Sequence, residues 1–145
     1  MLAKYWRLRG LWTADQTLTY NSDARVEVNW YGWKLTAGAL VYSAESTDDF
    51  GFVAAETWAT TVQKEITVVD NSSNLYLGVK GTLEVKADAD STDGTMALYL
   101  EESTDNTVWP SDLLDFDCAL DLRLVAVLTM STDAIDETRA TNFEF

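Results

Sequence analysis

The clearest indication of the fold is the segment from Asn74 to Ala87, NLYLGVKGTLEVKA. Its apolar residues alternate with polar and aromatic ones, with Leu75, Leu77, Val79, Leu83, Val85 and Ala87 on one side and Tyr76, Lys80, Thr82, Glu84 and Lys86 on the other. Successive side chains of a strand point to opposite faces, so this alternation predicts a long strand with one face on a core and one in water. The pattern describes folding and implies no chemistry.

Other segments along the chain also have the character of strands. We expect them at Ala3–Arg9, Arg25–Tyr31, Lys34–Ser43, Val62–Val69, Met96–Glu101, Leu122–Met130 and Thr141–Phe145. Gly32 should bend or end the second of these strands, and Gly38 should break the third. Leu122–Met130 is apolar at both parities, which predicts a strand covered on both faces. About seven to nine strands with little helix predict one all-β domain over residues 1–145, an antiparallel β-sandwich or jelly roll.

The charge balance limits the classes of partner. The chain has 24 acidic and 10 basic residues and a net charge of −14. Free nucleic acid is not an expected partner, because phosphate binding needs clustered Lys and Arg. A membrane is not expected either, since no apolar run approaches the roughly 20 residues needed to span one.

The N-terminal segment has the opposite charge to the rest of the chain. Lys4, Arg7 and Arg9 are three of the ten bases. A strand with these residues could dock on an acidic neighbour, including a second copy of the chain. Alternatively, it is a solvated edge strand on which Lys and Arg prevent unwanted pairing.

Residues for nucleophilic or metal chemistry are few. The chain has no histidine and a single cysteine, Cys118, in an apolar context typical of a buried residue. We therefore expect no enzymatic activity and no cofactor. Asp88, Asp90 and Asp93 before Gly94 are candidates for a calcium site, but their spacing does not match an EF-hand and a hairpin turn explains them. Asp112, Asp115, Asp117 and Asp121 are explained by the solvated side of a one-turn helix or an irregular crossover, and they would form a metal site only if their carboxylates converged.

Aromatic residues are concentrated in the first 33 positions. The adjacent pairs Tyr5/Trp6 and Trp30/Tyr31 place one ring on each face of their strands. An exposed ring would serve a protein interface or a sugar-stacking platform, whereas a second covered face would bury it. The candidate interface residues are Lys4, Tyr5, Trp6, Arg7, Arg9, Trp12, Trp30, Tyr31 and Trp33.

Residues Leu75 to Asp112, LYLGVKGTLEVKADADSTDGTMALYLEESTDNTVWPSD, resemble small β-sandwich structural proteins of tailed bacteriophages. The sequence KYWRL at Lys4–Leu8 is also similar to the first strand of discoidin-like jelly rolls in phage tail proteins. The resemblance implies a virion component, assembled in the host cytoplasm, that forms a homo-oligomer and binds other virion proteins.

Two functional hypotheses follow. The first is a capsid decoration or cement protein that binds the head shell through protein contacts, for which charge reversal at Arg7 and Arg9 should loosen the assembly. The second is a tail- or fibre-associated carbohydrate-binding module, in which some of Trp6, Trp12, Trp30 and Trp33 stack on sugar rings.

Overall fold

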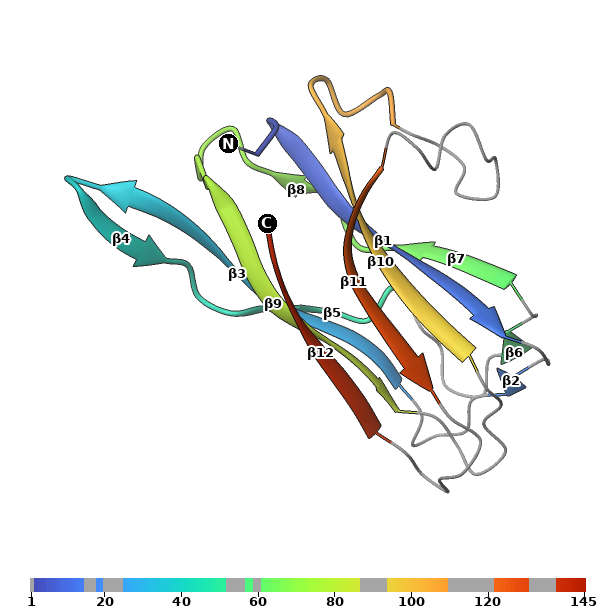
Figure 1. Cartoon of the computed structure of the whole chain (residues 1–145). Coiled ribbons are helices and arrows are strands. Elements are labelled where there is room, and N and C mark those ends of the chain that lie inside the picture. Colours follow the sequence, from blue (N-terminus) through green and yellow to red (C-terminus); the bar gives the residue numbers. More distant parts are fainter. Residues whose placement is uncertain are drawn as a thin grey trace.

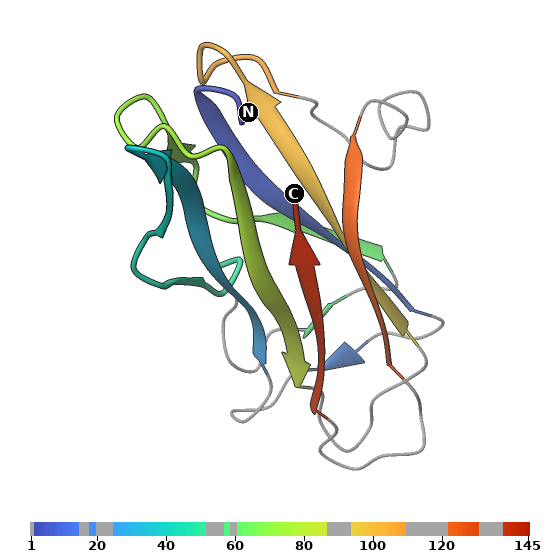
Figure 2. The ribbon, with the colours of Figure 1, turned by 60° about the vertical axis from the view of Figure 1, so that its left-hand side comes forward.

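The computed structural model describes residues 2–14, 18–19, 25–51, 57–58, 61–86, 94–109, 122–130 and 138–145. These residues form two antiparallel sheets of five strands each that pack against each other (Figures 1 and 2). The described part has no helix, and therefore none that is long and apolar enough to cross a membrane. The prediction of an antiparallel all-β sandwich is confirmed, with 10 strands in the two large sheets.

The first sheet has the order β11-β10-β1-β7, with β8 also paired to β1. Its strands are β1 (Tyr5–Ala14), β7 (Thr61–Glu65), β8 (Val69–Asp70), β10 (Gly94–Ser103) and β11 (Arg123–Met130). The second sheet has the order β12-β9-β3-β4, with β5 also paired to β3. Its strands are β3 (Arg25–Thr36), β4 (Ala39–Tyr42), β5 (Ser46–Asp48), β9 (Gly78–Lys86) and β12 (Thr138–Glu144). The short strands β2 (Leu18–Thr19) and β6 (Thr57–Trp58) pair with each other.

The core lies between the two sheets and contains the inward residues of every long strand. On β9 these are the odd-numbered residues Val79, Leu83 and Val85, which are fully buried as the alternation predicts. Large aromatic rings join the two layers. The ring of Trp6 on β1 meets that of Trp30 on β3 edge to face at 5.0 Å, and that of Phe145 at 6.0 Å. The apolar alternation of the sequence therefore sets which face of each sheet is covered.

β9 begins later than the sequence predicts. Leu75 lies in a loop, with a φ of 55° and 66% of its surface exposed. The buried side chain of Asn71 causes this, because it accepts a hydrogen bond from the Tyr76 backbone N–H at 2.8 Å and donates one to the Tyr76 carbonyl at 3.1 Å. A polar side chain that binds the backbone locally competes with strand pairing.

The sequence predicts that Gly32 bends or ends its strand, and the structure shows that it does not end it. β3 continues to Thr36, and the Tyr76 ring packs where a Gly32 Cβ would stand, 2.5 Å from its nearest carbon. The chain reverses at Ala37 and Gly38, which have φ values of 50° and 82°. Positive φ at both central residues is the geometry of a tight two-residue hairpin, so the expected break near Gly38 is confirmed.

Two predictions about strand environment are wrong. β1 is not an edge strand, because β10 pairs with one side of it and β7 and β8 with the other. β11 is not covered on both faces, since it lies at an edge of its sheet with 51% of Leu124 and 46% of Val127 exposed. A strand that is apolar at both parities can thus be open on one face, because a folded surface still contains much apolar area.

Candidate functional site

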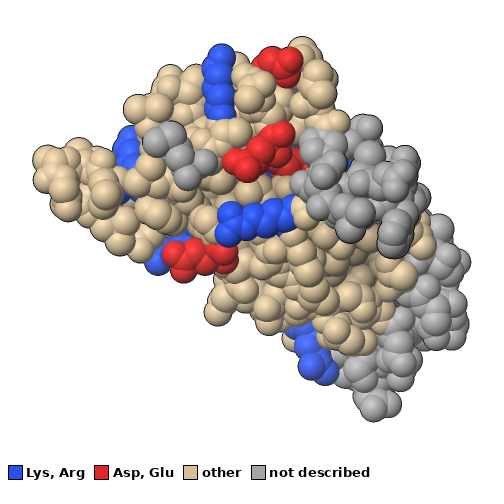
Figure 3. Space-filling view, turned by 45° about the horizontal axis from the view of Figure 1, so that its top comes forward, with Lys and Arg blue, Asp and Glu red and all other residues tan. Residues whose placement is uncertain are grey.

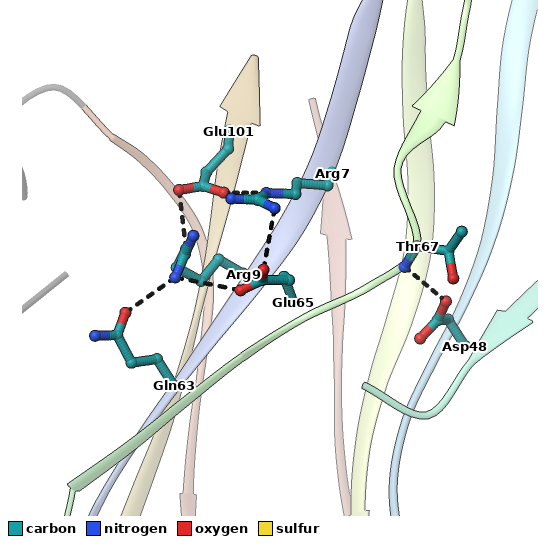
Figure 4. A network of polar contacts seen from close by, with 7 residues as sticks. All are labelled: Arg7, Arg9, Asp48, Gln63, Glu65, Thr67 and Glu101. Atoms are coloured by element: carbon teal, nitrogen blue, oxygen red, sulfur yellow. Dashed lines mark hydrogen bonds and ion pairs between the residues drawn. The ribbon is translucent and has the colours of Figure 1, made fainter. Parts of the chain in front are cut away.

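The basic residues of β1 take part in an ionic network on the outer face of the first sheet (Figure 4). The strand register places Arg7 opposite Glu101 on β10 and Arg9 opposite Glu65 on β7. Arg9 Nε lies 2.9 Å from Glu101 Oε1, and Arg7 Nε is paired with Glu101 Oε2. The same two guanidinium groups reach Glu65 at 3.1 and 3.3 Å. The positive charges of two arginines and the negative charges of two glutamates therefore neutralise one another across three strands.

This network is largely removed from solvent. Glu101 is 0% exposed, and the side chains of Arg7 and Arg9 are only 11% and 7% exposed. The Trp109 ring lies 4.5 Å from the Arg7 guanidinium, which adds a cation–π contact. The prediction that Arg7 and Arg9 dock on an acidic neighbour is therefore wrong, because their acidic partners belong to the same chain. Charge reversal there should break the fold before it affects any assembly.

Three of the candidate tryptophans belong to the core. Trp6, Trp12 and Trp30 are 0%, 1% and 8% exposed, so the prediction that they form a surface platform is wrong. The sequence showed that each aromatic pair divides between two faces but could not show which member points inward.

The other candidate aromatic residues lie on both sheets. Tyr5 is half-buried on the first sheet with the exposed Lys4 ammonium 4.9 Å from its ring centre. Tyr31 and Trp33 are half-buried on the second sheet, where the Trp33 ring packs on the backbone at Gly78. The structure therefore does not bring the predicted interface residues together into one surface.

An apolar projection, which the sequence reasoning missed, is formed by residues 33–44 and is here called the β3–β4 arm. It extends beyond the body of the sandwich in Figure 1, and its tip bears no charge in Figure 3. Its large apolar side chains are open to solvent, with Leu35 59%, Leu40 52%, Tyr42 44% and Val41 40% exposed. The signal in the sequence was the uninterrupted apolar run Ala39–Tyr42 after an Ala-Gly turn.

A depression lined by polar and aromatic side chains crosses the outer face of the second sheet beside this arm. A hollow of ≈ 440 Å³ is lined by Tyr31 on β3, Lys80 and Thr82 on β9, and Asn142 and Glu144 on β12. An adjoining hollow of ≈ 380 Å³ is lined by Tyr31, Tyr42, Ser43 and Lys80.

Several of the groups in this depression already have partners within the chain. Lys80 Nζ lies 4.0 Å from the Tyr42 ring centre, and Thr82 donates a hydrogen bond to Asn142 Oδ1 at 3.0 Å. The Tyr31 hydroxyl donates to Glu45, and this hydrogen bond raises the pKa of Tyr31. Two tyrosines next to fixed polar groups are suited to a ligand with both apolar and hydroxyl-bearing faces.

The acidic groups considered for metal binding lie elsewhere in the chain. Asp88, Asp90, Asp93 and the group at 112–121, like Cys118, are outside the described residues. Among the residues that the structure does describe, no group of three or more acidic or cysteine side chains could hold a metal ion. The calcium hypothesis is therefore neither supported nor contradicted by this structure.

The segment that resembles bacteriophage sandwich proteins provides one central strand to each sheet. β9 lies in the second sheet and β10 in the first, and each has a buried face in the core. Residues 87–93 and 110–112 of this segment are outside the described part. No family model, no curated protein and no solved structure matches the chain, so its membership of that group of proteins stays a prediction.

Proposed function

We propose that this protein is a non-enzymatic structural component of a bacteriophage virion, a decoration protein that binds the head shell through protein–protein contacts. The observation that supports it is the β3–β4 arm, which exposes four large apolar side chains on one projecting hairpin. A soluble monomer rarely exposes neighbouring apolar groups in this way, and such patches mark interaction sites.

The charged residues support a structural role for the first sheet. The two arginines and two glutamates that could have served acid–base or anion chemistry are bound to one another. Arg9 also donates to Gln63 at 3.1 Å, which occupies a further donor. Groups held in such a network support the sheet and are not available to a substrate.

The proposal is tested on particles made by the virus or lysogen that encodes the chain. Particles are purified on a density gradient, and their proteins are identified by mass spectrometry. We expect the chain to sediment with the particles at a constant ratio to the shell protein. Its presence only in the fractions of free protein would overturn the proposal.

The contribution of the arm is tested with Leu40→Ser, which keeps the edge of β4 but removes an exposed apolar group. We expect Leu40→Ser to reduce the amount bound per particle. Val108→Ser is the matched control, because Val108 is 73% exposed and lies outside the arm. Equal occupancy of the two variants would exclude the arm as the contact surface.

A second candidate function is carbohydrate binding, now on the depression of the second sheet instead of the tryptophans. The observation that favours it is the pair Tyr31 and Tyr42 beside Lys80, Thr82 and Asn142. A glycan screen of the wild type and Tyr31→Ala tests it, with Tyr5→Ala on the opposite sheet as the control. Binding that Tyr31→Ala abolishes and Tyr5→Ala preserves would favour a tail or fibre module.

A further inference from the structure

Strand β4 is an unprotected edge of the second sheet. It pairs with β3 through the register Trp33↔Tyr42 to Thr36↔Ala39, and it has no partner strand on its other side among the described residues. All four residues of β4, Ala39–Tyr42, are exposed. Natural edge strands are usually protected by a charge, a proline or a bulge, and this one has none of them.

The hydrogen-bond pattern of the hairpin shows which backbone groups of β4 are free. The Ser43 N–H donates to the Gly32 carbonyl at 2.8 Å, so Ser43 forms a hydrogen-bonded pair with β3. Such pairs alternate along an antiparallel ladder, and therefore Val41 and Ala39 also bond to β3. The N–H and C=O groups of Leu40 and Tyr42 point the other way. They form a short template that can accept another strand.

The distribution of charge favours a second copy of the chain as that strand. The net charge of −14 makes two copies of the chain repel each other. No acidic residue occurs between Glu27 and Glu45, and the arm contains a single charge, Lys34. The Lys34 ammonium is directed away from the free edge, because it donates to the Asn74 carbonyl at 2.9 Å. The tip of the arm is thus an uncharged surface that projects from the body of the sandwich (Figures 1 and 3).

We propose that two copies of this chain pair through β4, antiparallel and around a two-fold axis at Val41. Leu40 of each copy then exchanges backbone hydrogen bonds with Tyr42 of the second copy, and the two Val41 side chains face each other. The second sheet of one copy and that of the other then form one continuous sheet across the dimer. A two-fold contact of this kind is self-complementary, so one edge satisfies the other and the assembly closes.

The contact is small, and this sets its strength. A four-residue strand and its neighbours bury less than the roughly 800 Å² per partner of a standard interface, so we expect a weak, reversible association. The pairing and the proposed function both use the β3–β4 arm, but the pairing does not otherwise depend on the proposed function. On a particle surface, weak pairing between neighbouring copies would add to the affinity of each copy for the shell.

Sedimentation equilibrium up to about 0.5 mM protein tests the pairing. At about 0.15 M salt, charges separated by more than about 8 Å are screened, so the acidic bodies repel little while residues in contact still interact. We expect the wild type to form dimers. Val41→Lys and Val41→Glu should each raise the dissociation constant at least tenfold, because each places like charges directly opposite one another.

An equimolar mixture of the two variants is the decisive sample. It should recover dimers, because Lys from one copy then faces Glu from the other across the axis. Val108→Lys, with the same added charge on an exposed residue outside the arm, should dimerise like the wild type. Unchanged circular dichroism of both Val41 variants verifies that they are folded.

Each possible result decides the matter. A wild type that stays monomeric, or a Val41→Lys variant that dimerises like the wild type, would overturn the pairing. A mixture that stays monomeric would overturn the two-fold axis at Val41. The pairing and the proposed function can fail separately. If monomeric Val41→Lys still binds to particles, the proposed function stands and particle binding does not require the dimer. If the wild type forms dimers but is absent from particles, the pairing stands and the proposed function is wrong.

Discussion

The buried carboxylate of Glu101 should be the most important single charge in this fold. Glu101→Gln keeps the shape of the side chain but removes its charge and turns an N–H group toward the guanidinium groups of Arg7 and Arg9. Those two side chains are only 11% and 7% exposed, so water cannot replace the lost carboxylate. Removing one member of a buried ion pair costs about 3–5 kcal/mol, which is a large part of the roughly 5–15 kcal/mol that stabilises a typical domain.

Glu65 is the matched control because it contacts the same two arginines with 43% of its side chain exposed. Glu65→Gln should cost no more than about 1 kcal/mol, as for exposed ion pairs. The two variants therefore differ by burial and not by chemistry. In thermal unfolding the predicted losses correspond to a fall in Tm of about 10 °C for Glu101→Gln and about 3 °C or less for Glu65→Gln.

Urea unfolding followed by tryptophan fluorescence measures both variants on one scale. The midpoint should shift strongly for Glu101→Gln with an unchanged slope, because the surface exposed on unfolding is the same. Equal free energies of unfolding for the two variants would refute the reasoning. So would a loss below about 1 kcal/mol for Glu101→Gln, since that value is typical of exposed pairs.

Three further predictions concern local features. The hydrogen bonds from Thr107 and Val108 hold the pKa of Asp105 well below that of an unfolded aspartate, about 3.9. The ionised Asp105 carboxylate therefore stabilises the fold at pH values above the unfolded pKa, and this contribution disappears as the pH falls through the folded pKa. An NMR titration in which the carboxyl ionises at its ordinary pKa would contradict this. Ala37→Asn should stabilise the arm by about 1 kcal/mol, because Asn tolerates the φ of 50° better than Ala and precedes Gly38 in the favoured turn pair; slower amide exchange in β4 would confirm it. Val127→Ser should change the free energy of unfolding by less than about 0.5 kcal/mol, whereas Leu128→Ser, at a buried position, should cost several times more; similar losses in urea unfolding would mean that β11 is covered on both faces.

Much of the fold could be predicted from local patterns because each depends on neighbours in the sequence. The alternation around Leu83 and Val85 and the turn at Gly38 are of this kind. The burial of alternate residues follows from the two-residue period of a strand, and the chain reversal follows from backbone sterics. The late start of β9 could not be predicted in the same way. It depends on the buried Asn71 side chain, whose hydrogen bonds to Tyr76 are visible only once the loop is formed.

The candidate site was harder to predict because it depends on pairing between distant strands. Arg7 and Arg9 resemble docking residues until the β1–β10 register places Glu101, far along the chain, opposite Arg7, where its carboxylate binds both guanidinium groups. Likewise Trp6 resembles an exposed platform until β3 brings Trp30 against its edge. Residue type alone therefore predicted charged and aromatic residues as interface residues, and many of these residues are bonded or buried within the fold.

The same reasoning explains why the exposed surface lies at the arm. A side chain is available for a partner only when its own chain leaves it unsatisfied, and strong charges and large rings are the groups that a fold satisfies first. Leu35, Leu40 and Val41 lie on a hairpin that leaves the body of the sandwich, and outside this hairpin no strand among the described residues pairs with them. In an acidic chain, a hairpin without acidic residues is also the surface that another acidic copy can approach. The geometry of the hairpin and the distribution of charge therefore indicate the same residues as a contact surface, although none of these residues has a reactive or charged side chain.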